Sequence, residues 1–133
     1  MKSFTDLPQS KKLAEILPIE SADMHYVRKR YDFMGNPVDG EWSHPKYGNT
    51  NSKYANYIVQ NFESYERIPC WSLASLLNIL DYPQLSKDKI GDEKVGWMVS
   101  VYPDNCRYDS TWYDNPIDAC VEMILKLHEV NLI

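Results

Sequence analysis

Apolar side chains recur at helical spacing in three parts of the chain, and each part also carries helix-start signals. In the first part, Thr5 or Asp6 can cap a helix that has Pro8 in its first turn. Pro18 is expected to end this helix. The second helix is expected over residues 69–80, because a proline opens the segment and apolar residues then follow helical spacing.

The strongest helix signal lies near the C-terminus. Asn115 is a good N-cap, Pro116 suits the first helical position, and Asp118 places a carboxylate in the first turn, where it favours the helix dipole. We therefore expect a helix of about three turns. Its apolar face is formed by Ile117, Cys120, Val121, Ile124 and Leu127.

Alternating apolar residues predict strands between these helices. Short strands are expected over residues 22–27 and 96–102, and a turn at 103–105 leads to a possible partner strand over 106–112. Residues 54–62 fit either a strand or one helical face, with the strand weakly favoured. The sequence therefore leaves that segment open.

Residues 28–52 show neither the helical spacing nor the strand alternation of apolar residues. Five glycines and prolines punctuate this polar stretch, so a long irregular loop is expected there, of the kind that is often functional. Together the elements predict one α+β domain over residues 1–133, with about three helices packed on a small antiparallel sheet.

The composition narrows the functional classes. Apolar residues make up 44% and charged residues 25% of the 133 residues, as in ordinary globular proteins. The net charge of −5 disfavours non-specific binding to nucleic acid or anionic membranes. No apolar run reaches the roughly 20 residues of a membrane span. The lack of a visible signal peptide and the odd number of cysteines predict a cytoplasmic protein with reduced thiols.

Cys70 is the candidate for catalysis. At the start of the expected second helix, the helix dipole would favour its thiolate. The Cys70-Trp71-Ser72 segment also resembles the nucleophile region of papain-like cysteine proteases. The upstream glutamine of that pattern is missing, and the only downstream histidine is His128, in the last turn of a helix. We therefore favour Cys70 as a small core residue and keep a thiol hydrolase as the alternative.

Aromatic residues gather around the irregular loop and suggest a binding surface. Trp42, Tyr47, Tyr54 and Tyr57 are the candidate partner-binding residues, because aromatic side chains are enriched at protein interfaces. Our leading hypothesis is a non-enzymatic protein that binds another protein. The sequence does not indicate the partner or the oligomeric state.

A second, less favoured binding mode uses the cluster of Arg28, Lys29 and Arg30. Basic residues with aromatic neighbours can bind single-stranded nucleic acid. The acidic total charge favours the simpler interpretation of a solvated charge run beside a loop.

Cofactor and metal sites are not indicated. The glycines form no phosphate-binding motif, so no cofactor is expected. The histidines and cysteines are scattered without the close spacing typical of metal ligands, so no metal is expected either. His25 is expected on the solvated face of its strand.

Three segments together carry a resemblance that spans both ends and the middle of the chain. They are residues 9–17 with 21–24 (Gln-Ser-Lys-Lys-Leu-Ala-Glu-Ile-Leu and Ser-Ala-Asp-Met), 69–77 (Pro-Cys-Trp-Ser-Leu-Ala-Ser-Leu-Leu) and 115–124 (Asn-Pro-Ile-Asp-Ala-Cys-Val-Glu-Met-Ile). In this order the chain resembles small uncharacterised proteins of gut anaerobic bacteria that are associated with phages, prophages and other mobile elements. That group has no established activity, so the resemblance implies a genetic context and no site residue.

Overall fold

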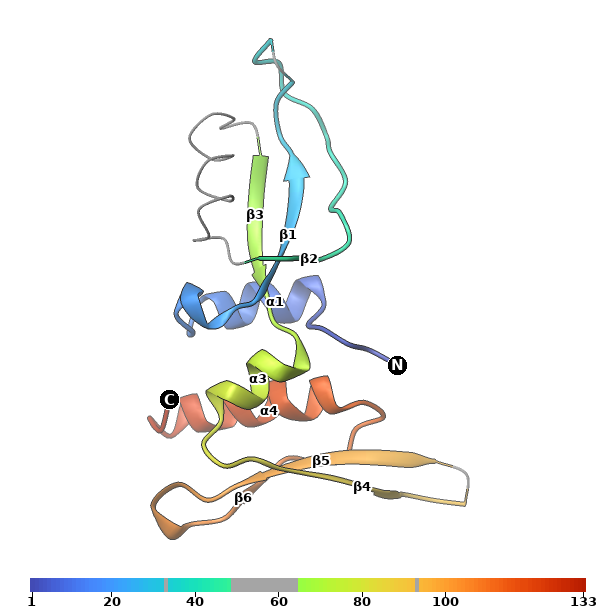
Figure 1. Ribbon diagram of the computed structural model, residues 1–133, viewed down its shortest axis with the longest axis vertical. Coiled ribbons are helices and arrows are strands. Elements are labelled where there is room, and N and C mark those ends of the chain that lie inside the picture. The colour runs from blue at the N-terminus through green and yellow to red at the C-terminus, as the bar shows by residue number, and fades with distance from the viewer. Residues whose placement is uncertain (33, 49–64, 93) are drawn as a thin grey trace. The chain divides into compact units, whose positions relative to one another are not determined.

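The computed structural model describes residues 1–32, 34–48, 65–92 and 94–133. Within these ranges it contains three α-helices and two three-stranded antiparallel sheets (Figure 1). The predicted α+β class is confirmed, with two small sheets where one was expected. The described residues form two compact units, Asp6–Trp71 and Met1–Thr5 with Ser72–Ile133. The expectation of one domain over 1–133 stays a prediction.

Helix α1 (Leu7–Ala14) opens the unit Asp6–Trp71 and begins where the sequence predicted. Asp6 is its N-cap: a side-chain oxygen accepts a hydrogen bond from the backbone N–H of Gln9 at 2.9 Å. The Gln9 side chain in turn accepts from the N–H of Asp6 at 3.1 Å, which completes a capping box. The helix ends at Ala14, earlier than Pro18 had suggested.

Strand β1 (Met24–Lys29) is the centre of the sheet in this unit. It pairs over its full length with β3 (Tyr65–Cys70), while the short β2 (Lys46–Tyr47) pairs with the other edge of β1. The strand predicted over 22–27 is therefore confirmed with its bounds shifted, whereas β3 was not predicted. Helix α1 packs against β3. The apolar core of this unit includes Leu13, Met24, Tyr26, Ile68, Cys70 and Trp71.

The helix predicted over residues 69–80 is wrong in its first part. Strand β3 continues through Cys70, and helix α3 (Leu73–Ile79) begins after it. Ser72 caps α3, because its hydroxyl accepts a hydrogen bond from the N–H of Ser75 at 3.3 Å. The proline resembled a helix start, but pairing along the whole of β1 decides the backbone conformation here.

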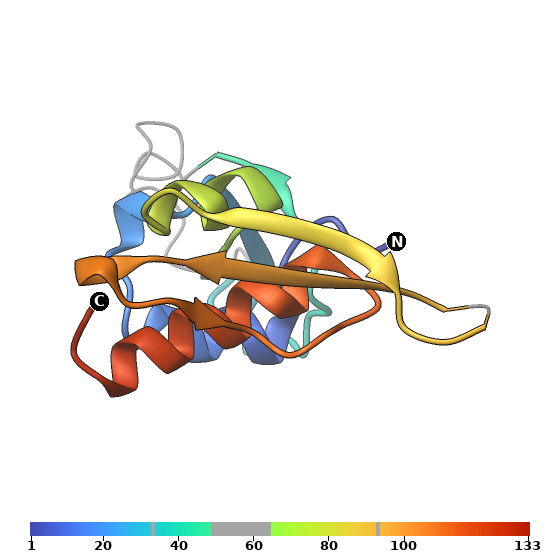
Figure 2. The ribbon, with the colours of Figure 1, turned by 90° about the horizontal axis from the view of Figure 1, so that it is seen from below.

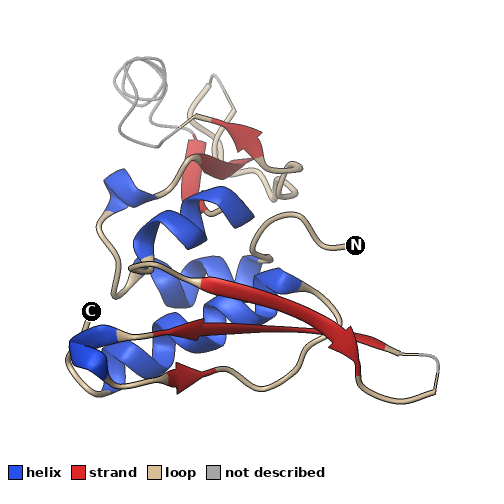
Figure 3. Cartoon of the chain, turned by 60° about the horizontal axis from the view of Figure 1, so that its bottom comes forward, coloured by secondary structure: helices blue, strands red, loops and turns tan. Residues whose placement is uncertain are grey.

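The other unit contains the second sheet, in the order β4-β5-β6. The strand expected over 96–102 is confirmed as β5 (Val95–Val101). The short helical turn η2 (Pro103–Asn105) leads into β6, which confirms the expected turn. The partner strand expected over 106–112 is present but limited to Tyr108–Asp109. Strand β4 (Gln84–Lys89) pairs antiparallel with β5 (Figure 3). Its alternation was hidden because most of its side chains are polar.

Helix α4 (Pro116–Glu129) has the start that the sequence predicted. The side chain of Asn115 accepts a hydrogen bond from the N–H of Asp118 at 2.9 Å. The helix runs along the sheet, with its buried face toward β5 (Figure 2), and α3 also packs against it. Neither α4 nor any other helix in the described ranges is long and apolar enough to cross a membrane. The core of this unit includes Leu76, Val99, Val101, Ile117, Cys120, Ile124 and Leu127.

The first residues of the chain belong to the same unit as its second half. The ammonium of Lys2 lies 2.8 Å from a carboxylate oxygen of Asp118, at the start of α4. Phe4 forms an isolated antiparallel bridge with Ser72. The segment Met1–Thr5 is therefore tied to residues that follow it by a large distance in the sequence.

Candidate functional site

Cys70 is the last residue of β3 and has no exposed surface. It does not lie at a helix N-terminus, so the electrostatic argument for an activated thiolate does not apply. Tyr26 is buried beside it, and burial first, then the interaction with Cys70, raises the pKa of the Tyr26 hydroxyl. A substrate cannot reach a fully buried thiol. The position of Cys70 thus gives the thiol hydrolase interpretation no support.

The three free cysteines make the burial of Cys70 directly measurable. With iodoacetamide near neutral pH, we expect the native protein to be labelled at Cys106, which is exposed, while Cys70 and Cys120 stay protected. Burial also raises the pKa of the Cys120 thiol to about 12, which disfavours its reactive thiolate. Peptide mass spectrometry after a short reaction checks the sites, and denaturation in urea should expose all three. Native labelling of Cys70 as fast as Cys106 would contradict the structure.

The predicted partner-binding aromatics fall into different settings. Tyr54 and Tyr57 lie outside the described residues. Trp42 is half-buried, and the guanidinium of Arg28 lies 4.8 Å from its ring centre. Tyr47, in β2, is 82% exposed. Of the two described candidates, only Tyr47 offers most of its side chain to a partner.

The β1–β2 connection, residues 30–32 and 34–45, runs back beside β1 (Figure 1). The N–H of Val38 donates to the carbonyl oxygen of Arg30 at 2.8 Å, and the N–H of Ser43 donates to that of Val27 at 2.9 Å. Of the irregular loop expected over residues 28–52, residues 28–29 belong to β1, Lys46–Tyr47 form β2, and residues 49–52 lie outside the described residues. The backbone of the connection is fixed to the sheet by hydrogen bonds.

Asp32 organises the tip of this connection. One of its carboxylate oxygens accepts hydrogen bonds from the N–H groups of Met34 and Asn36, both at 2.9 Å. These bonds, chiefly that from Asn36, lower the pKa of the Asp32 carboxyl. Gly35 has a φ of 82°, a conformation that favours glycine in such a turn. Asp32 therefore holds the described residues 34–36 of this turn in place.

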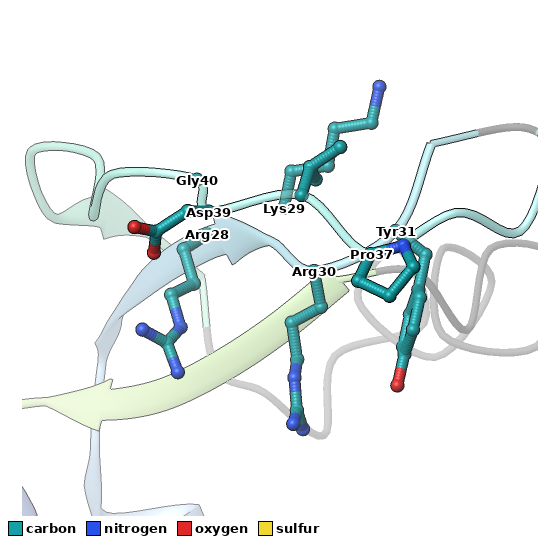
Figure 4. Close-up of a pocket in the computed structure, with 8 residues that line it drawn as sticks. Arg28, Lys29, Arg30, Tyr31, Pro37, Asp39 and Gly40 are labelled. Atoms are coloured by element: carbon teal, nitrogen blue, oxygen red, sulfur yellow. The ribbon is translucent and has the colours of Figure 1, made fainter.

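A hollow of about 220 Å³ lies between the end of β1 and the returning chain (Figure 4). Gly40 passes so close to the backbone of Lys29 that a Cβ at this position would collide with the Lys29 carbonyl oxygen. On the opposite side, Tyr31 forms an isolated bridge with Pro37. The hollow is lined by Arg28, Lys29, Arg30, Tyr31, Pro37, Val38, Asp39 and Gly40.

The basic cluster of the sequence lines this hollow but does not act as one patch. Arg28 and Arg30 project to the same side in Figure 4, whereas Lys29 projects to the opposite side. Alternation along β1 explains why Arg28 and Lys29 project to opposite sides. Arg28 forms an ion pair with Glu66 of β3, with 2.6 Å between the guanidinium Nε and a carboxylate oxygen. Sequence reasoning missed Glu66, because it lies far from the arginines in the chain and no local pattern connects them.

The prediction that His25 lies on the solvated face of its strand is wrong, because His25 is buried. Its Nδ1 lies 2.6 Å from the carbonyl oxygen of Gly48, so Nδ1 carries the proton and donates. Gly48 directly follows β2, which pairs with β1 at His25. The fold therefore explains His25 as a structural link between β1 and the residue that follows β2.

The described residues offer no metal site, and the chain resembles no known protein in the comparisons below. Within the described ranges, histidine, cysteine, aspartate and glutamate side chains form no cluster that could hold a metal ion. Comparison of the chain with protein-family models, curated proteins and solved structures finds no match. The resemblance to proteins of mobile elements therefore stays an expectation.

Proposed function

We propose that this protein acts without catalysis, by binding another protein through the β1–β2 connection and β2. The observation that carries the proposal is the exposure of four large apolar or aromatic side chains along this stretch of chain. We call them the connection surface. They are Tyr31, Met34, Val38 and Tyr47, which are 39%, 71%, 37% and 82% exposed.

The chemistry of the connection surface supports this function. Tyrosine, methionine and arginine are enriched at protein interfaces, and exposed apolar groups beside polar ones are typical of binding sites. The hydrogen bonds from Val38 and Ser43 to β1, together with the Asp32 turn, hold the backbone in place before binding. A preorganised surface loses less conformational entropy when a partner binds.

The genetic context and location belong to the same proposal. The resemblance to proteins of phages and other mobile elements suggests that the partner is a protein of the bacterial host or of the element itself. All three cysteines are free thiols, which is compatible with the reducing cytoplasm where we place the protein.

Replacement of Tyr47 by serine should weaken partner binding by about tenfold or more, as expected for an aromatic side chain central to an interface. The measurement is a pulldown from a lysate of the natural host, with captured proteins quantified by mass spectrometry. Tyr82→Ser is the matched control, because Tyr82 is 91% exposed but lies outside the connection surface. The proposal requires a protein that the wild type and Tyr82→Ser capture equally and Tyr47→Ser loses. Equal capture by all three, or no specific capture, would refute it.

A further inference from the structure

We infer that the hollow beside Arg30 receives an acidic segment of the partner protein, with a carboxylate at Arg30 and an apolar side chain against Tyr31. This inference rests on the proposed function and adds the chemistry of the partner. Its basis is the difference between the two arginines that line the hollow.

Arg28 is already engaged inside the molecule. Its guanidinium contacts Glu66 at 2.6 Å and lies over the ring of Trp42 at 4.8 Å. Its side chain is 34% exposed. These contacts fix Arg28 as part of the wall of the hollow, where it adds positive charge without needing a new partner.

Arg30 is placed differently. Its Nε lies 3.9 Å from the Glu66 carboxylate, which is too long for a hydrogen bond, and its side chain is 54% exposed. A guanidinium has five N–H donors in a planar fork that matches a carboxylate. Arg30 therefore presents donors that a carboxylate of the partner can accept.

Tyr31 adds an apolar surface next to this charge. It is 39% exposed, and the bridge to Pro37 places the proline beside it at the edge of the hollow. Figure 4 shows Arg30 and Tyr31 projecting to the same side. A segment with an acidic residue next to an apolar one can contact both.

The surrounding carboxylates favour a short acidic peptide over a nucleic acid. Asp39 lines the same hollow, Glu66 lies beside both arginines, and Asp32 holds the neighbouring turn. A phosphate backbone carries one charge per nucleotide and would meet these carboxylates along its path. A peptide can place a single carboxylate at Arg30 and avoid them.

The test uses fluorescence anisotropy with the full chain and a short labelled peptide that alternates glutamate and leucine. The same peptide with glutamine in place of glutamate, and a labelled single-stranded oligothymidylate, are titrated in parallel. We expect binding of the glutamate peptide and about tenfold weaker binding of the glutamine peptide, because a charge-assisted hydrogen bond is lost.

Two variants with opposite expected effects identify the site. Arg30→Gln should weaken binding of the glutamate peptide about tenfold. Glu66→Gln should strengthen binding of this peptide several-fold, because the substitution removes a competing negative charge beside Arg30. Lys94→Gln, at an exposed position outside the hollow, is the matched control and should bind like the wild type. A variant that had merely lost its fold would not bind more tightly, so Glu66→Gln separates a charge effect from misfolding.

Several outcomes would overturn the inference. They are equal binding of the two peptides, no effect of Arg30→Gln, tighter binding of the oligothymidylate, or no binding of the glutamate peptide at about 1 mM. If these occur while Tyr47→Ser still loses the natural partner, the proposed function stands and only the acidic partner is excluded. If the peptide binds through Arg30 but no specific partner depends on Tyr47, the proposed function fails.

Discussion

Replacement of Trp71 by alanine should lower the free energy of unfolding by about 3–5 kcal/mol, the range for deleting a buried tryptophan side chain. Trp71 has no exposed surface and heads the fully buried side chains in size. Its indole N–H also donates a hydrogen bond to the hydroxyl of Ser21 at 3.0 Å, which the alanine variant loses. Urea unfolding followed by tryptophan fluorescence or circular dichroism measures the change.

Two further variants make this result specific. Trp71→Phe keeps most of the apolar volume and should lower the free energy of unfolding less than Trp71→Ala does. Trp112→Ala removes a tryptophan that is 39% exposed, so it should lower the free energy of unfolding clearly less than Trp71→Ala does. If Trp71→Ala lowered the stability by less than about 1 kcal/mol, the central place of Trp71 in the core would be wrong.

The Gly40→Ala substitution should displace the returning chain from β1 and deform the hollow. The added Cβ would lie 3.0 Å from the backbone nitrogen of Lys29 and closer still to its carbonyl oxygen. The backbone atoms of Lys29 cannot rotate away from the added Cβ. We therefore expect the free energy of unfolding to fall by about 1–3 kcal/mol, as for other overpacked sites. Amide hydrogen exchange at Val38, which donates to Arg30, should accelerate along with the loss of stability.

Gly96→Ala is the matched control for this substitution. Its added Cβ meets the side chains of Ile90 at 2.8 Å and of Trp112 at 3.1 Å, but these side chains are 42% and 39% exposed and can move aside. We expect a smaller loss of stability and no change in exchange at Val38. Unchanged protection of Val38 in Gly40→Ala would show that the connection does not depend on this close approach.

The parts of the fold that local signals determine were predictable from the sequence. Asn115, Pro116 and Asp118 define the start of α4 because each acts on the first turn of its own helix. Strand β5 was predictable for the same reason, since its alternation is contained in a few residues. Asp6 was identified as a possible cap of α1 from its position before Pro8.

Pairing between distant segments was not predictable in this way. Pro69 and Cys70 carry a helix-like local pattern, but their conformation is set by pairing with β1. His25 was expected in solvent because nothing near it in sequence indicated that β2 and Gly48 would cover it. The contact of Arg28 with Glu66 likewise joins residues 38 positions apart.

The candidate site shows the same limit. The arginines, Trp42 and Tyr47 were identified because basic and aromatic residues can be counted along the chain. Which arginine stays available depends on its distance to Glu66, a property of the folded sheet. The sequence thus predicted a candidate region, and the structure shows which of its charged side chains are engaged within the fold.

The pairing of Phe4 with Ser72 has a consequence for how the protein is made. It brackets the segment Asp6–Trp71 as an insertion within the other unit, whose own sequence is discontinuous. On the ribosome, Lys2 is synthesised well before Asp118 and cannot form its ion pair until Asp118 has followed. The segment Asp6–Trp71 is complete long before then, so its sheet can form before α4 of the other unit has been synthesised.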